Sequence, residues 1–92
     1  MSLTTTDEVP VDEAIGHRIR MARVNASMTQ SQLGEHLGCS SQQIHKYERG
    51  SNRVSAGTLF VIAQLLDYPV DWFFLNPKTP KTSDPIANVP YH

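Results

Sequence analysis

The segment TQSQLGEHLGCSSQQIHKYERG, residues 29–50, carries the start and stop signals of two consecutive helices. Thr29 and Gln32 stand three residues apart, just ahead of an apolar-periodic run. This spacing is typical of a capping box, in which each side chain satisfies a free backbone amide of the other residue. Gly38 predicts the end of the first helix, because glycine adopts the left-handed conformation without strain.

The second helix of this segment is predicted to begin almost immediately. Ser40 and Gln43 repeat the capping-box spacing, and Gly50 predicts the C-terminal end of the helix. Only Gly38 and Cys39 separate the two helices. A connection this short forces a sharp crossing angle, which is the arrangement of a helix-turn-helix motif.

One face of this second helix is polar. With Ile44 directed at the core, an ideal helix turns four side chains away from it and places Ser41 at the flank. The four are Gln42, His45, Lys46 and Arg49. Their amide, imidazole and cationic groups match the donors and acceptors on base edges in the major groove of DNA. The alternative is an ordinary solvated surface, since most surface helices have a polar outer face.

The rest of the chain predicts an all-α fold of five short helices, because no alternating strand pattern is present. Apolar stripes of helical period place a first helix near residues 11–26 and a fourth after Ser55, and a short fifth helix begins near Val70. The first stripe contains Ile15, Ile19, Ala22 and Ala26. The stripe of the fourth helix contains Leu59, Phe60, Ile62, Ala63 and Leu66.

Ninety-two residues allow one domain with a modest core, which leaves little room for an elaborate active-site cleft. We expect residues 1–10 to form a flexible arm, 11–75 the helix-turn-helix domain and 76–92 an extended, proline-rich tail. The net charge of −1 hides an uneven distribution of charge along the chain. Residues 18–53 hold six basic residues and two acidic ones. Such a basic middle suits a polyanion, although a solvated mixed-charge surface would give the same count.

The single cysteine, Cys39, cannot form an internal disulfide. A reducing, cytoplasmic location is therefore expected. In addition, no stretch approaches the roughly 20 apolar residues of a membrane span. Cys39 lies close in sequence to His36 and His45, but a zinc site needs about four convergent ligands and a nucleophilic cysteine needs an oriented base. Neither set is apparent, so no metal, cofactor or catalytic site is expected, and Cys39 is assigned to packing.

Residues 29–50 resemble the helix-turn-helix of the Cro and phage-repressor family, also called the Xre family. The matching features are Thr-Gln at the start, Leu-Gly before the turn and Glu-x-Gly at the end. The likeness extends to IGHRIRMAR before this segment and TLFVIAQLLDYPVDWFF after it, and covers residues 14–75. Gly34 and Cys39 depart from the customary alanine and valine. The resemblance implies a five-helix, lambda-repressor-like DNA-binding domain.

The resemblance also implies roles for residues on and around the second helix of the motif, over residues 40–49. Four side chains on its outer face would contact bases: Ser41, Gln42, His45 and Lys46. Four more residues would contact the DNA backbone: Gln30, Gln43, Asn52 and Arg53. Gln30 would in addition brace the start of that helix.

Further roles implied by the resemblance concern packing and assembly. Arg23 and Glu48 would form an internal ion pair between the first helix and the end of the helix over residues 40–49. Val61 and Trp72 stand where relatives are often polar, and aromatic residues are enriched at interfaces, so we expect them in a dimer contact. Apart from the resemblance, Arg18 and Arg20 are either phosphate contacts or solvated helix charges, and the solvated interpretation is favoured.

These features predict a sequence-specific, repressor-like transcriptional regulator that is not an enzyme and whose partner is double-stranded DNA. It would act as a homodimer on an approximately palindromic operator, with the helix over residues 40–49 of each copy in the major groove. The alternative is a protein-interaction adaptor or antitoxin-like module on the same fold, with the tail at residues 76–92 as its partner-binding segment.

Overall fold

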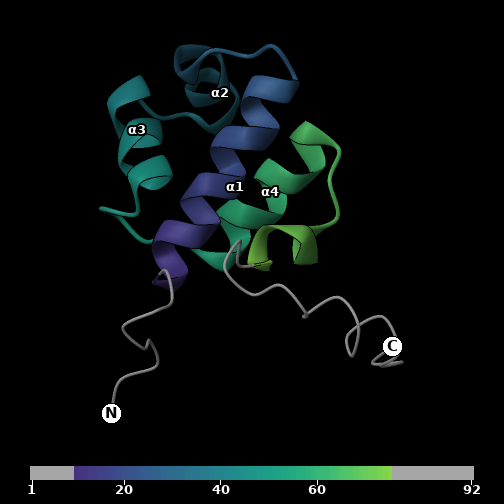
Figure 1. Ribbon diagram of the computed structural model, residues 1–92. Helices are drawn as coiled ribbons and strands as arrows, with labels where there is room; N and C mark the ends of the chain where they lie inside the picture. Colours follow the sequence, from purple (N-terminus) through teal and green to yellow (C-terminus); the bar gives the residue numbers. More distant parts are fainter. Residues whose placement is uncertain (1–9, 76–92) are drawn as a thin grey trace.

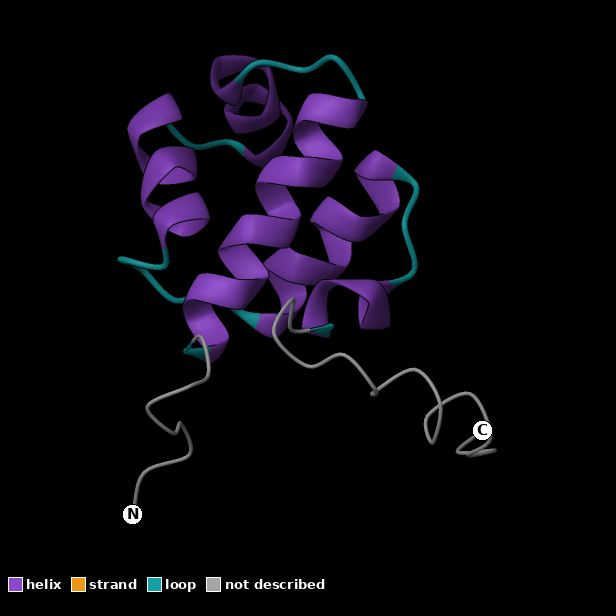
Figure 2. Ribbon diagram, viewed as in Figure 1, coloured by secondary structure: helices purple, strands orange, loops and turns teal. Residues whose placement is uncertain are grey.

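The computed structural model describes residues 10–75, and every element within them is helical (Figures 1 and 2). The elements are α1 (Val11–Asn25), α2 (Gln30–Leu37), α3 (Ser41–Arg49), α4 (Ala56–Leu66) and the 3-10 helix η1 (Val70–Phe74). The predicted all-α fold is confirmed, with the fifth helix formed as a single short 3-10 segment. The proposed tail and nearly all of the proposed arm lie outside the described residues.

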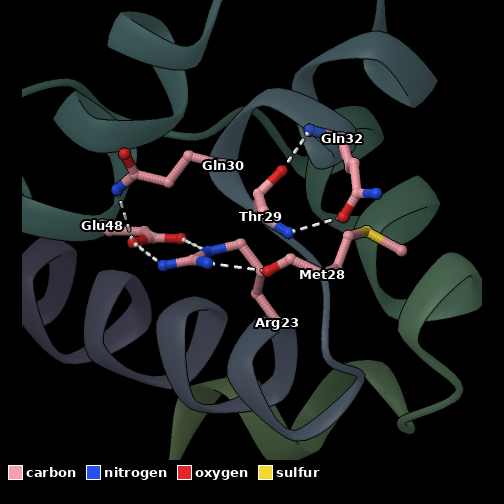
Figure 3. Close-up of polar contacts among 6 residues, drawn as sticks. All are labelled: Arg23, Met28, Thr29, Gln30, Gln32 and Glu48. Atoms are coloured by element: carbon pink, nitrogen blue, oxygen red, sulfur yellow. Dashed lines mark hydrogen bonds and ion pairs between the residues drawn. The ribbon is translucent and has the colours of Figure 1, made fainter.

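The start of α2 has the predicted capping box (Figure 3). Thr29 Oγ1 accepts a hydrogen bond from the Gln32 amide at 3.0 Å, and Gln32 Oε1 accepts one from the Thr29 amide at 2.8 Å. Gly38 ends the helix with φ 76°, in the left-handed region. The local chemistry of the sequence therefore sets both ends of α2.

The start of α3 differs in one detail from the prediction. Ser40 Oγ accepts a hydrogen bond from the Gln43 amide at 3.1 Å, as expected of an N-cap residue. The return bond from the Gln43 side chain is not formed, so this cap is a half-box and the prediction of a complete one was wrong. One serine hydroxyl suffices to satisfy a free amide of the first turn.

The core draws one large, fully buried side chain from each of the five elements. These are Ile19, Leu33, Ile44, Ile62 and Phe73, in chain order. α1 crosses the middle of the molecule, with α3 on one side of it and α4 and η1 on the other (Figure 1). No element can be removed without exposing a core side chain, which ties the position of α3 to the whole domain.

Two residues assigned to apolar stripes are exposed. Ala26 lies beyond the last residue of α1, where it serves as the C-cap. Phe60 is 53% exposed, because it lies about 100° around the helix from the buried Leu59 and so leaves the core-facing stripe. Cys39, by contrast, is half-buried and packs against the core, as predicted.

Gly34 allows α2 to lie directly against the turn before α3. A Cβ atom at this position would stand 2.5 Å from the carbonyl oxygen of Cys39 and 3.2 Å from that of Ser40. Ordinary van der Waals contact begins near 3.4 Å. Glycine in place of the customary alanine therefore permits a closer approach of the two helices than a methyl group would allow.

We expect Gly34→Ala to lower the free energy of unfolding by about 1–3 kcal/mol, because the backbone of the turn must move to admit the methyl group. Gly57→Ala is the matched control, since a Cβ there meets nothing within 4 Å. That variant should be neutral or more stable by up to about 1 kcal/mol, from helix propensity alone. Urea denaturation measures both. Equal stability of the two variants would contradict the close approach.

Candidate nucleic-acid interface

α3 presents a polar face to solvent and an apolar face to the core. Ile44 is fully buried and Tyr47 packs against the core cluster. The side chains of Gln42, His45 and Lys46 are exposed. Arg49 is exposed as well, and Ser41 and Gln43 are half-buried. The helix lies at the edge of the molecule, beside α1 and α2, so its outer face is accessible (Figure 1).

The other side of α3 is held by a buried ion pair (Figure 3). Arg23 Nε donates to Glu48 Oε2 at 2.6 Å, and Arg23 Nη2 donates to Glu48 Oε1 at 3.1 Å. The Glu48 side chain is only 2% exposed. Two parallel hydrogen bonds from one guanidinium to one carboxylate fix both distance and orientation between α1 and α3.

Two further hydrogen bonds complete this buried cluster, which we call the Arg23–Glu48 cluster. Arg23 Nη1 donates to the backbone oxygen of Met28 at 2.8 Å, in the loop between α1 and α2. Gln30 Nε2, in the first turn of α2, donates to Glu48 Oε1 at 3.1 Å. Within the described residues, no buried side-chain polar atom lacks a partner. The cluster thus joins α1, α2 and α3 at one point.

The position of Gln30 corrects part of its predicted role. Its side-chain amide reaches Glu48, in the last turn of α3, and not the start of that helix. The reason is that Glu48 offers a charged acceptor, whereas the Gln43 amide in the first turn of α3 is already bound by the Ser40 hydroxyl. Gln30 remains half-buried, so part of its side chain reaches the surface beside α3.

The loop after α3 carries Asn52 and Arg53, both exposed. Arg53 Nε lies 3.3 Å from Asp12 Oδ2 at the start of α1, and the arginine side chain is 84% exposed. An ion pair this exposed is worth little in water, so it leaves Arg53 free to exchange Asp12 for another anion. The loop therefore places a cation beside α3.

The burial of Glu48 also decides the charge of the outer face. Glu48 is the only acidic residue of α3, and Arg23 neutralises it in the interior. The charged side chains left on the exposed face are Lys46 and Arg49. They give the outer face of α3 the positive sign that a phosphate backbone attracts.

The residues expected at a dimer contact lie on α4 and η1. Val61 is 43% exposed, whereas Trp72 is half-buried and packs against the core. The structure also shows two large apolar side chains that the sequence reasoning did not assign to this contact: Phe60, 53% exposed, and Phe74, 55% exposed. The exposure of Phe74 follows from its position directly after Phe73, since two consecutive side chains of a helix cannot both face the same core.

Other kinds of site have little support in the described residues. No three His, Cys, Asp or Glu side chains in residues 10–75 stand close enough together to hold a metal ion. None of the described helices has the length and apolar character needed to cross a membrane.

Comparisons with known proteins agree with this geometry. A family profile described as helix-turn-helix matches residues 19–73. An uncharacterized HTH-type transcriptional regulator of Sinorhizobium medicae is 51% identical over 65 residues, which cover 71% of this chain and 47% of the relative. An uncharacterized transcriptional regulator in the ATPase CF(0) region of Rhodospirillum rubrum is 47% identical over 64 residues, covering 70% and 59%. The chain thus spans about half the length of these curated relatives.

Solved structures show the same fold. The P22 c2 repressor protein, in complex with a synthetic operator, superposes with a TM-score of 0.60 at 27% identity and covers 65% of this chain and 91% of that one. The clp gene regulator ClgR from C. glutamicum gives a TM-score of 0.67 at 27% identity and covers 72% and 86%. The arrangement of α2 and α3 is therefore one found in known regulators.

We expect Glu48→Ala to lower the free energy of unfolding by about 3–5 kcal/mol, because it leaves the Arg23 guanidinium buried without its partner. Urea denaturation followed by circular dichroism measures this loss. The double substitution Arg23→Leu with Glu48→Leu should cost less than the single one, since no buried charge remains.

Asp12→Ala is the matched control for Glu48→Ala, since it removes the acid of the exposed ion pair with Arg53. It should change stability by at most about 1 kcal/mol. If Glu48→Ala and Asp12→Ala cost the same, the Arg23–Glu48 cluster does not hold α3.

Proposed function

This chain belongs to the helix-turn-helix family of DNA-binding transcriptional regulators, and we propose that it recognises one particular DNA sequence as a homodimer and acts as a repressor. The observation that carries the proposal is the face of α3, which exposes amide, imidazole and cationic groups while its one carboxylate is withdrawn into the interior. Such a face donates to base edges and is not repelled by phosphate.

Base recognition is assigned to four residues of α3. They are Ser41, Gln42, His45 and Lys46. Gln42 can form two hydrogen bonds with an adenine, and Lys46 can donate to the acceptors of a guanine. Ser41 lies in the first turn of the helix, which is the part that enters the groove in helix-turn-helix proteins. The Arg23–Glu48 cluster supports this use of α3, because base readout requires side chains held on a fixed backbone.

Contacts with the DNA backbone are assigned to residues that surround this face. Gln30, Gln43, Asn52 and Arg53 carry donors at the start of α2, on the flank of α3 and in the loop after it. Donors of this kind position a protein on DNA without reading its sequence. They should supply the part of the affinity that falls with rising salt.

Homodimer formation is assigned to the exposed apolar side chains of α4 and η1. Val61, with Phe60 on the same helix and Phe74 on η1, leaves a large apolar area in water. Trp72 would contribute its accessible edge. Two copies related by a two-fold axis would place their α3 helices in successive major grooves, about one turn of DNA apart, on an approximately palindromic operator.

We expect Gln42→Ala to relax the choice of base at one position by about 1–3 kcal/mol, because it removes a two-bond contact. Arg53→Ala should instead weaken binding to all duplexes alike and reduce the salt dependence. Fluorescence titration against matched and mismatched duplexes at several salt concentrations separates the two effects. Gln64→Ala, an exposed glutamine on α4, is the control and should bind as the unsubstituted chain does. A uniform loss from both test variants would refute the division of roles.

Val61→Asp should weaken self-association at least tenfold, because it places a carboxylate in the apolar contact. Val24→Asp is the matched control, since Val24 on α1 is similarly exposed, 49% against 43%. Sedimentation velocity over a concentration series measures both variants in the absence of DNA. Equal weakening by the two variants would place the contact elsewhere.

A further inference from the structure

Arg18 is bound within the domain, and the expectation that it is a solvated charge was wrong. Its Nε donates to the backbone oxygen of Leu75 at 3.0 Å. Its guanidinium carbon lies 4.7 Å from the centroid of the Trp72 ring, a cation–π distance. The side chain thus spans from the middle of α1 to the end of η1.

Trp72 also packs against Tyr68, in the segment before η1. The centroid of its ring lies 4.2 Å from that of Tyr68 and 5.1 Å from that of Phe73, and the Trp72 and Phe73 rings are nearly perpendicular. Tyr68 in turn accepts a hydrogen bond from Asn25 Nδ2 at 3.0 Å, at the end of α1. α1 is therefore bonded to the chain on both sides of η1. Arg18 binds Leu75, directly after η1, and Asn25 binds Tyr68, two residues before it.

η1 needs such attachment because it is short. A helix of five residues has too few hydrogen bonds to persist alone, and Phe73 is its only fully buried side chain. Phe74 follows on the solvent side, 55% exposed. The Arg18 bond to Leu75 fixes the backbone directly after Phe74, and Leu75 itself donates to the Trp72 oxygen at 3.3 Å. An exposed anchor contributes most to binding when its backbone is already held in the bound position.

We propose that Arg18 is a positioning residue for self-association: through Trp72 and Leu75 it latches η1 onto α1 and so presents Phe74 to a second copy of this chain. The inference rests on the proposed homodimer. It adds a residue of α1 that acts on the contact through Trp72 and Leu75 of its own chain. Loss of these two Arg18 contacts would loosen the end of η1 around Phe74 and Leu75, while Phe73 stays buried in the core.

The test compares Arg18→Gln with Arg20→Gln, because both remove one positive charge from α1 and Arg20 is exposed. Trp72 is the only tryptophan of the chain, so its fluorescence reports on the latch directly. We expect Arg18→Gln to shift this emission to the red and to increase quenching by acrylamide. Sedimentation velocity should show self-association weakened roughly tenfold, as loss of a cation–π contact and a hydrogen bond implies. Arg20→Gln should change neither, and far-ultraviolet circular dichroism should stay the same for both.

Two further variants keep the inference falsifiable if Arg18→Gln unfolds. Arg18→Lys keeps a cation over the Trp72 ring and should recover part of the lost self-association. Phe74→Ser removes the presented side chain and leaves the contacts of Arg18 intact. It should therefore weaken self-association, while Trp72 fluorescence, read at a concentration where both proteins are monomeric, stays unchanged.

Three outcomes would overturn the inference. In the first, Arg18→Gln alters the Trp72 fluorescence and self-association stays at the wild-type strength. In the second, Phe74→Ser associates as tightly as the unsubstituted chain. In the third, the unsubstituted chain stays monomeric at every concentration, which also refutes the proposed homodimer. The third outcome is measured on the unsubstituted chain, without any variant, so it can be distinguished from the first two.

Discussion

The buried pair of Arg23 and Glu48 is the interaction on which the rest of the domain depends. Burying two charges is costly unless each finds its partner in good geometry, and here each nitrogen of the Arg23 guanidinium and each oxygen of the Glu48 carboxylate has a hydrogen-bond partner. Because the guanidinium also binds the Met28 carbonyl and the carboxylate also binds Gln30, one cluster fixes three helices relative to one another. The same pairing removes the only acid of α3 from solvent, so one interaction sets both the orientation of the helix and the charge of its outer face.

α3 itself is too short to keep this position unaided. Its nine residues depend on Ile44 in the core, on Ser40 at the start and on Glu48 near the end. Because residue 34 is a glycine, α2 can lie close to the turn just before α3. A helix restrained along its whole length presents its outer side chains on a rigid backbone, which is what discrimination between bases requires.

Local chemistry was the most predictable part of the molecule. Thr29, Gly38 and Ser55 mark helix ends because each acts within three or four residues of itself. Hydrophobic periodicity predicted burial less reliably for residues at the margin of an apolar stripe. It identified the buried side of α4 but wrongly included Phe60. The order of the five elements followed from these two signals.

Contacts between distant residues could not be predicted from pattern. Arg18 and Leu75 are 57 positions apart, and nothing in the residues near Arg18 indicates a carbonyl partner. The pairing of Arg23 with Glu48, 25 positions apart, followed from family resemblance alone, and the bond from Gln30 to that carboxylate was missed. The polar face of α3 was predictable, because Ile44 fixes which way the helix points. Which of its side chains would touch DNA depends on how the domain docks on a duplex, and no sequence pattern contains that geometry.

Selection of DNA duplexes from a random-sequence pool by the full chain is the most direct test of the central claim, that a restrained α3 reads bases in the major groove. The claim predicts enrichment of one sequence with two-fold symmetry, whose half-sites lie about one helical turn apart, roughly 10 base pairs. Recovery of duplexes with no shared sequence, bound with equal affinity, would contradict it.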